Sequence, residues 1–164
     1  MLQKAIKLQP NYARAHNNLG IVLQELGELQ KAIGCYEKSI QIDPNYAEAH
    51  NNLGIVFKEL GELQKAIACH EKGIQIDPNN SDAYNSLGAV FGELGELQKE
   101  KSCYEKSIQI NPSNSDAYWN LHSFALDIDE ALTILKKLYE FDNKYIKAKF
   151  MISALKGFKG KFED

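Results

Sequence analysis

Three cysteines and two of the histidines are the residues whose chemistry would matter most if they met in space. His16 and His50 are 34 residues apart, and the cysteines recur at the same interval, at Cys35, Cys69 and Cys103. Packed helices lie roughly 10 Å apart, which exceeds the ~7 Å Cα separation that a disulfide tolerates and the reach of a shared metal ion. The spacing therefore predicts half-buried reduced thiols, histidines that replace aromatic residues at the edge of a core, and no metal site.

The carboxylates of the segment ELGELQK are a second set of candidates, because paired carboxylates can act as general acid and base. Glu25 and Glu28 flank a turn, however, and no nucleophile stands beside them in the sequence. The chain also lacks the motifs G-x-S-x-G, G-x-x-x-x-G-K and H-E-x-x-H. We therefore expect solvated helix junctions at these glutamates, and a protein that is not an enzyme and uses no cofactor.

Composition limits the partners of this 164-residue chain. Its net charge of -3 is opposite to the basic stripe of nucleic-acid-binding proteins, so we expect no nucleic-acid partner. No apolar run approaches the ~20 residues that span a bilayer, so we expect no membrane segment. The beginning of the chain also lacks the apolar centre of a signal peptide. These features favour a single domain or short repeat array in the cytoplasm.

A 34-residue repeat organises the chain. The segment ELGELQK stands unchanged at 25–31, 59–65 and 93–99, and prolines recur at the same interval, at Pro10, Pro44, Pro78 and Pro112. Apolar residues within each unit follow helical spacing. Gly27 predicts a turn in the middle of the first unit, and the Asp43-Pro44 pair predicts a stop at its end. The first unit is therefore expected to hold two helices, at about 13–26 and about 28–41.

Further boundaries follow from local signals. Ser81 and Ser115 are placed to cap the first helices of later units. Asp127 and Glu130 have the spacing of a capping box, which predicts helices at about 116–126 and about 129–141 in the fourth unit. Segment 144–158 aligns with another first helix and 160–164 with the turn after it, while residues 1–9 align with the end of a second helix. The chain is therefore expected to be a piece of a longer array or a truncated reading frame.

This pattern resembles the tetratricopeptide repeat, W-x2-L-G-x2-Y, then A-x3-F, then P. Ala32 and Ala66 supply the small residue of the second helix, and the Leu-Gly pairs are Leu19-Gly20, Leu53-Gly54 and Leu87-Gly88. The resemblance implies an all-α, right-handed solenoid of antiparallel helix pairs. Its units would be the end of a truncated repeat at 1–10, full repeats at 13–46, 47–80 and 81–114, a shortened repeat at 115–145, and the first helix of a truncated repeat at 146–164.

Two departures from the family pattern predict irregular packing. Glu100 replaces the small alanine of the third repeat, which places a carboxylate where two helices should approach closely. His122 replaces the glycine of the Leu-Gly pair in the fourth repeat, which is also shorter than the others.

The resemblance also implies a binding surface, because the first helices of such repeats line a groove that holds extended peptides. Residues opposite the Leu-Gly pair would face this groove. The expected peptide-binding residues are Arg14, Asn17, Asn18, Glu48, Asn51, Asn52, Asp82, Asn85, Trp119 and Asn120. Trp119 could anchor a ligand there or fill the core space left by His122, and the sequence leaves both open.

The asparagine just before Leu-Gly resembles the asparagine ladder of O-linked N-acetylglucosamine transferases. A carboxamide offers two donors and an acceptor, so Asn18, Asn52 and Asn120 could pair with a peptide backbone. A rung every ~10 Å would meet about every third residue of an extended chain, which rises ~3.3 Å per residue. Ser86 interrupts the ladder. The alternative is that these amides only bond neighbouring helices.

Two functions follow from these features. The first is a protein–protein interaction scaffold that binds extended polypeptide segments in the concave groove. The alternative is the non-catalytic, substrate-targeting portion of a larger transferase whose catalytic domain lies outside this chain. A clamp for a terminal carboxylate is disfavoured, because Glu48 and Asp82 would repel it. Apolar surface around Phe150, Met151 and Leu155 predicts end-to-end self-association.

Overall fold

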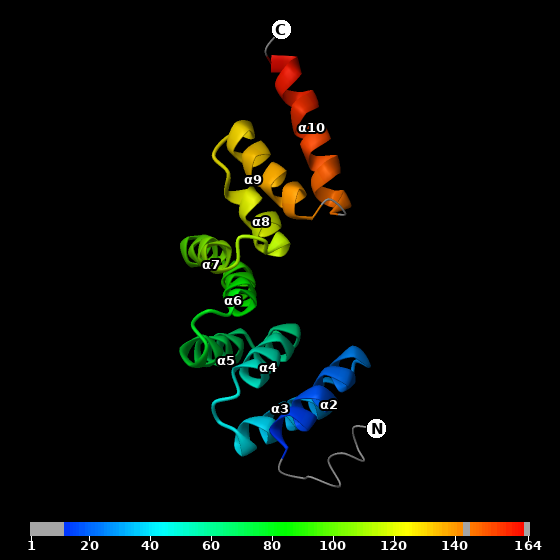
Figure 1. Ribbon diagram of the computed structural model, residues 1–164, viewed down its shortest axis with the longest axis vertical. Coiled ribbons are helices and arrows are strands. Elements are labelled where there is room, and N and C mark those ends of the chain that lie inside the picture. The colour runs from blue at the N-terminus through cyan, green and yellow to red at the C-terminus, as the bar shows by residue number, and fades with distance from the viewer. Residues whose placement is uncertain (1–11, 143–144, 163–164) are drawn as a thin grey trace.

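The computed structural model describes residues 12–142 and 145–162, and this part of the chain is helical with no strand. Its helices follow one another as packed pairs along the long axis (Figure 1). The first three pairs are α2 (Ala13–Glu25) with α3 (Leu29–Ile42), α4 (Ala47–Glu59) with α5 (Leu63–Ile76), and α6 (Ser81–Glu93) with α7 (Leu97–Ile110). The predicted all-α solenoid of helix pairs is therefore confirmed, whereas the helix end expected at 1–10 lies outside the described residues.

The C-terminal third is less regular. It comprises α8 (Ser115–Leu121), the short 3-10 helix η1 (His122–Phe124), α9 (Ile128–Phe141) and α10 (Ile146–Phe162). The prediction of an unbroken helix over 116–126 was wrong, because the α-helix ends where the imidazole of His122 replaces the packing glycine. The turn predicted at 160–164 was also wrong, since α10 continues to Phe162. A glycine inside a helix costs only about 1 kcal/mol and does not by itself stop it.

A left-handed glycine ends the first helix of each regular pair. Gly27, Gly61 and Gly95 have φ of 74°, 74° and 73°, which a residue with a side chain rarely adopts. In the first pair the N–H of Glu28 donates to the carbonyl of Leu23 at 2.8 Å, and the N–H of Gly27 donates to that of Gln24 at 2.9 Å. These two bonds form a Schellman motif, which turns the chain into the second helix.

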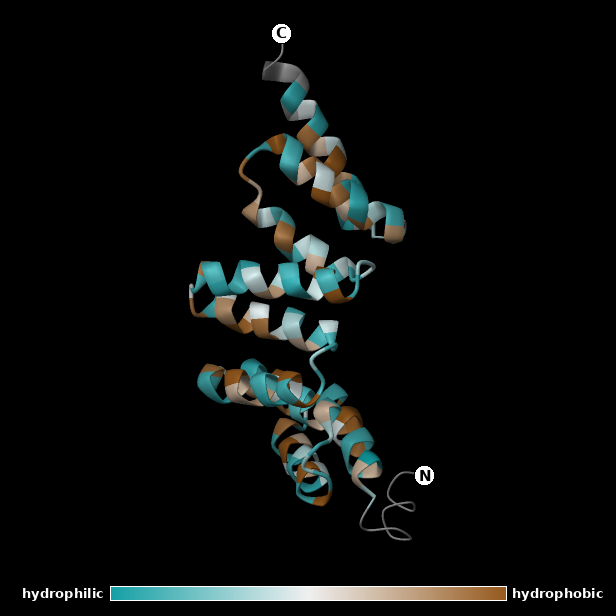
Figure 2. Ribbon diagram, turned by 60° about the vertical axis from the view of Figure 1, so that its left-hand side comes forward, coloured by the Kyte–Doolittle hydropathy of each residue, from teal (hydrophilic) through white to brown (hydrophobic). Residues whose placement is uncertain are grey.

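Close packing within each pair depends on the glycine of the Leu-Gly dipeptide. A Cβ at Gly20 would overlap the ring of Tyr36, and one at Gly54 would overlap the ring of His70. Hydrophobic and hydrophilic residues alternate along the helices (Figure 2), and buried apolar residues of successive pairs pack together. The resulting core continues from one pair to the next. Each pair therefore needs its neighbours to bury its apolar surface, as expected for a solenoid.

The caps of α6 and α8 lie one residue before the predicted serines. The side chain of Asn80 accepts from the N–H of Ala83 at 3.0 Å, and that of Asn114 accepts from the N–H of Ala117 at 3.2 Å. Ser81 is therefore the first residue inside its helix, and the prediction that it is the cap was wrong, as it was for Ser115. Asparagine is as effective a cap as serine, so the sequence allowed either register.

The third pair accommodates Glu100 through a second substitution. Gly92 stands where the first two repeats have Gln24 and Lys58, and a Cβ there would come within 2.7 Å of the Glu100 carboxylate. The freed carboxylate accepts a hydrogen bond from the hydroxyl of Tyr104 at 3.2 Å. Gly92 and Glu100 are thus a compensating pair, and the expected packing defect is relieved locally.

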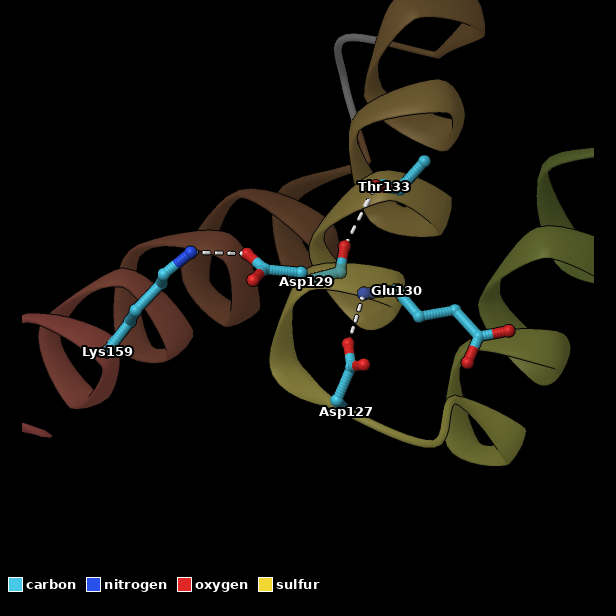
Figure 3. A network of polar contacts seen from close by, with 5 residues as sticks. All are labelled: Asp127, Asp129, Glu130, Thr133 and Lys159. Carbon is cyan, nitrogen blue, oxygen red and sulfur yellow. Dashed lines mark hydrogen bonds and ion pairs between the residues drawn. The ribbon is translucent and has the colours of Figure 1, made fainter.

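The start of α9 has the side-chain cap that its sequence predicts (Figure 3). Asp127 accepts from the N–H of Glu130 at 2.8 Å. The carboxylate of Glu130 reaches back to the N–H of Leu126 at 2.7 Å, one residue before the usual partner in a capping box. Lys159 of α10 pairs with Asp129 at 2.6 Å, which joins the last two helices.

Candidate functional site

The first helices of successive pairs also contact each other, α2 with α4 and α4 with α6. We call the surface that α2, α4, α6 and α8 share, on the side carrying the predicted binding residues, the inner face. Arg14, Glu48 and Asp82 lie exposed in the first turns of α2, α4 and α6. With Asp116 at the equivalent place in α8, three carboxylates and one guanidinium mark this edge. The edge is therefore acidic beyond α2.

Asn17 connects α2 to α4 across the inner face. This buried side chain donates to the carboxylate of Glu48 at 3.1 Å and accepts from the amide of Asn52 at 3.0 Å. The hydroxyl of Tyr46 donates to the other Glu48 oxygen at 3.0 Å. Both hydrogen-bonding groups of the Asn17 amide are thus engaged between repeats.

The junction of α6 with α8 has a similar connection. The amide of Asn120 donates to the oxygen of Asn85 at 3.1 Å, and Asn114 donates to the carboxylate of Asp82 at 3.1 Å. Asn52 and Asn120, two rungs of the predicted ladder, therefore do bond neighbouring helices. Each amide uses only one of its N–H groups for this bond, so its oxygen and its second N–H remain available to a ligand.

The junction of α4 with α6 lacks this bond. Ser86 stands where α4 and α8 carry asparagine, and among the described residues no donor reaches the side-chain oxygen of Asn51, unlike that of Asn17. The Asn51 oxygen is buried without a partner and occupies the space left by Gly73, where the first and third repeats have serine. A cavity of about 240 Å³ opens here between the two helices, lined by Glu48, Asn51, Asn52, Ile55, Asp82 and Ser86 among others.

Trp119 belongs to the C-terminal core more than to the groove. The indole is half-buried, with ring centroids 4.6 Å from His122 and 5.7 Å from Tyr145, and it packs against the cluster around Leu135 and Leu138. It thus occupies space beside His122, as one of the two sequence-based alternatives proposed. Burial and a hydrogen bond to Asp116 raise the pKa of Tyr145 beside it.

The reactive residue types lie apart from one another in the structure. The cysteines are free thiols of intermediate exposure, and burial raises the pKa of Cys69 and of Cys103 to about 11, so the thiolate nucleophile is scarce at neutral pH. The turn glutamates pair with lysines three residues later, as Glu96 does with Lys99 at 2.6 Å. Among residues 12–142 and 145–162, no three metal-ligating side chains gather into a site.

Residues that the sequence-based prediction missed are Asn80 and Asn114, which line or bridge the junctions around α6, whereas Ser86 was expected only as an interruption of the ladder. The sequence carried a signal for the missing asparagine bond between α4 and α6, because Ser86 and Gly73 differ from their counterparts in the neighbouring units.

In the described part of the chain, no helix is long and apolar enough to cross a bilayer.

Family models and solved structures agree with this architecture. Two models of the tetratricopeptide repeat match residues 11–79 and 71–101. A crystal structure of MamA is 31% identical over 89% of this chain and 87% of that chain, with a TM-score of 0.73. The chain therefore belongs to the tetratricopeptide repeat family. No curated protein matches it in sequence.

Two more distant structures share the fold alone. YrrB, a tetratricopeptide repeat protein described as having an unusual peptide-binding site, is 21% identical over 97% of this chain and 84% of that chain, with a TM-score of 0.72. PilF of Pseudomonas aeruginosa is 20% identical over 92% of this chain and 70% of that chain, with a TM-score of 0.83. Members of this repeat family generally serve as non-catalytic interaction scaffolds.

Proposed function

We propose that this protein is an interaction scaffold whose inner face binds extended polypeptide segments. One observation carries the proposal: an ordered series of amides on α2, α4 and α8 presents free hydrogen-bonding groups beside an acidic edge. Asn18, Asn52 and Asn120 remain only partly buried, so a ligand can reach them. Main-chain amides of an extended peptide need both a donor and an acceptor, and each rung offers both.

The neighbouring structures support the class of partner. YrrB has the same fold and is described as having a peptide-binding site. The dispersed reactive residues of the present chain favour binding over catalysis. Asparagine is also a poor helix former, costing about 0.5 kcal/mol relative to alanine inside a helix, and its recurrence on one helix face fits a binding role in addition to the bonds between helices.

The test removes the three rungs together. A net hydrogen bond contributes roughly 0.5–1.5 kcal/mol, so Asn18→Ala, Asn52→Ala and Asn120→Ala in combination should weaken peptide binding by about tenfold or more. Fluorescence anisotropy with a labelled random-sequence peptide pool would measure this change. Because Asn52 and Asn120 also bond Asn17 and Asn85, the triple variant should melt slightly below the parent.

A matched control exists on the second helices. Gln41, Gln75 and Gln109 are exposed amides at equivalent places in α3, α5 and α7, and each accepts from a lysine of its own helix. Replacing these three by alanine removes the same number of amides and should leave peptide affinity unchanged. The proposal would be refuted if the parent and the inner-face variant bound the peptide pool with equal affinity.

We further propose self-association through the C-terminal helix. Phe150 on α10 is 72% exposed, although Met151 and Leu155, expected to be exposed with it, are half-buried against the C-terminal core. Such an exposed phenylalanine is the kind of surface that a neighbouring repeat covers.

A further inference from the structure

The cavity between α4 and α6 is the one junction of the inner face where the asparagine series fails. At the α2–α4 and α6–α8 junctions an asparagine amide spans the space and donates to the previous repeat. At the α4–α6 junction Ser86 is too short to do so, and the space is a cavity of about 240 Å³. We refer to this space as the junction cavity.

The lining of the junction cavity is rich in acceptors. Glu48 and Asp82 contribute carboxylates from α4 and α6, and no described residue that lines the cavity is basic. Glu48 already accepts from Asn17 and Tyr46, and Asp82 accepts from Asn114, yet each carboxylate has lone pairs left. Ile55 supplies an apolar wall. Carboxylates beside an apolar wall suit a side chain with a long aliphatic stem and a cationic head.

Asn51 carries an unsatisfied acceptor beside the cavity. It lines the cavity, is only 8% exposed, and its oxygen is buried without a hydrogen-bond partner. Buried polar atoms are almost always paired. Its counterpart Asn17 accepts a hydrogen bond from the next repeat. Asn51 instead turns toward α5, because Gly73 has no side chain to occupy that space. Rotation of its side chain would present the oxygen to a donor in the cavity.

We infer that the junction cavity binds an arginine side chain of the extended polypeptide. This inference rests on the proposed function and gives that surface a sequence preference. A guanidinium has five N–H donors in a planar fork, enough to reach two carboxylates and an amide oxygen at once, whereas a lysine ammonium has three on a single point. Arginine is therefore preferred to lysine, and neutral or acidic side chains are rejected.

The test uses two heptapeptides of alanine and serine that differ only at the central residue, arginine in one and its neutral isostere citrulline in the other. Titration followed by ¹H–¹⁵N NMR reports both the affinity and the surface that binds. The arginine peptide is expected to bind the parent protein about fivefold or more tightly, since charge-assisted bonds are roughly twice as strong as neutral ones. Its largest shifts should fall on Asn51, Asn52 and Ser86.

Three variants locate the preference. Glu48→Gln with Asp82→Asn removes both charges and keeps one acceptor oxygen on each side chain, so it should abolish the preference for arginine. Ser86→Asn fills the cavity as its counterparts do and should abolish it without changing any charge. Glu37→Gln, an exposed carboxylate on α3, removes one charge elsewhere and should leave the preference intact.

The outcomes separate this inference from the proposed function. If both peptides bind the inner face of the parent equally, the junction cavity is not an arginine site but the scaffold function stands. If the preference survives in either the double variant or Ser86→Asn, the inference is likewise overturned. If neither peptide shifts any inner-face resonance, both the inference and the proposed function fail.

Discussion

His70 makes a specific contribution to the pH dependence of stability. It occupies the place of Tyr36 and Tyr104 in the neighbouring repeats and is fully buried over Gly54, and neither ring nitrogen has a hydrogen-bond partner among the described residues. Burial, assisted by the positive charge of Lys58, lowers the pKa of His70 from 6.5 to about 4. The folded protein therefore holds this imidazole neutral at pH values where the unfolded chain protonates it.

The sign and size of the effect follow from proton linkage. Between pH 6.5 and pH 4 the unfolded chain binds more protons than the fold, so stability falls as the pH falls through this window. The full stabilisation is present above pH 6.5. One pKa unit corresponds to 1.36 kcal/mol, which gives a loss of about 2 kcal/mol at pH 5 and about 3 kcal/mol once the folded state also protonates.

Urea unfolding of the parent and of His70→Tyr, at pH 7.5 and at pH 5, measures this contribution. The variant should be at least as stable at pH 7.5, because Tyr36 packs over Gly20 as His70 packs over Gly54. It should lose about 2 kcal/mol less than the parent on acidification. The reciprocal variant Tyr36→His should lose more than the parent. Identical losses in the parent and His70→Tyr would refute a buried neutral imidazole.

Three other predictions concern packing, thiols and assembly. Gly92→Gln should gain about 1 kcal/mol more stability in a Glu100→Ala background than in the parent, as measured in a double-mutant cycle by urea unfolding; additive effects would contradict the compensating pair. A thiol assay without reductant should count three free cysteines in the denatured monomer and find them slow to react when folded; fewer than three would contradict their separation. Phe150→Lys should reduce concentration-dependent light scattering, and a parent that stays monomeric at millimolar concentration would exclude this association.

The repeat made the architecture predictable from the sequence. An unchanged 34-residue period, a Leu-Gly pair and a turn glycine in each regular unit specified two helices and the Schellman turn between them. The helix from 13 was predicted to end at 26 and ends at Glu25, and its partner was predicted at 28–41 and lies at Leu29–Ile42. Boundaries were less certain where two capping residues stand side by side, as with Asn80 and Ser81.

The site was predictable only as a surface. Helical spacing indicated which residues share a face, but hydrogen bonds between repeats depend on rotamers that spacing does not specify. Asn17 and Asn51 hold equivalent positions in successive repeats. Asn17 nevertheless bonds Glu48 and Asn52, whereas Asn51 turns toward Gly73. The end of α8 at Leu121, where His122 replaces the packing glycine, was likewise not specified by helical spacing.

Photo-crosslinking tests whether extended peptides bind the inner face. A random-sequence peptide pool is crosslinked to the parent protein, and the attachment sites are mapped by mass spectrometry. Binding at the inner face predicts crosslinks concentrated on α2, α4, α6 and α8, on the side of Asn18, Asn52 and Asn120, and competition for these sites by unlabelled peptide. Crosslinks confined to the exposed faces of α3, α5 and α7, or spread evenly over the molecule, would contradict it.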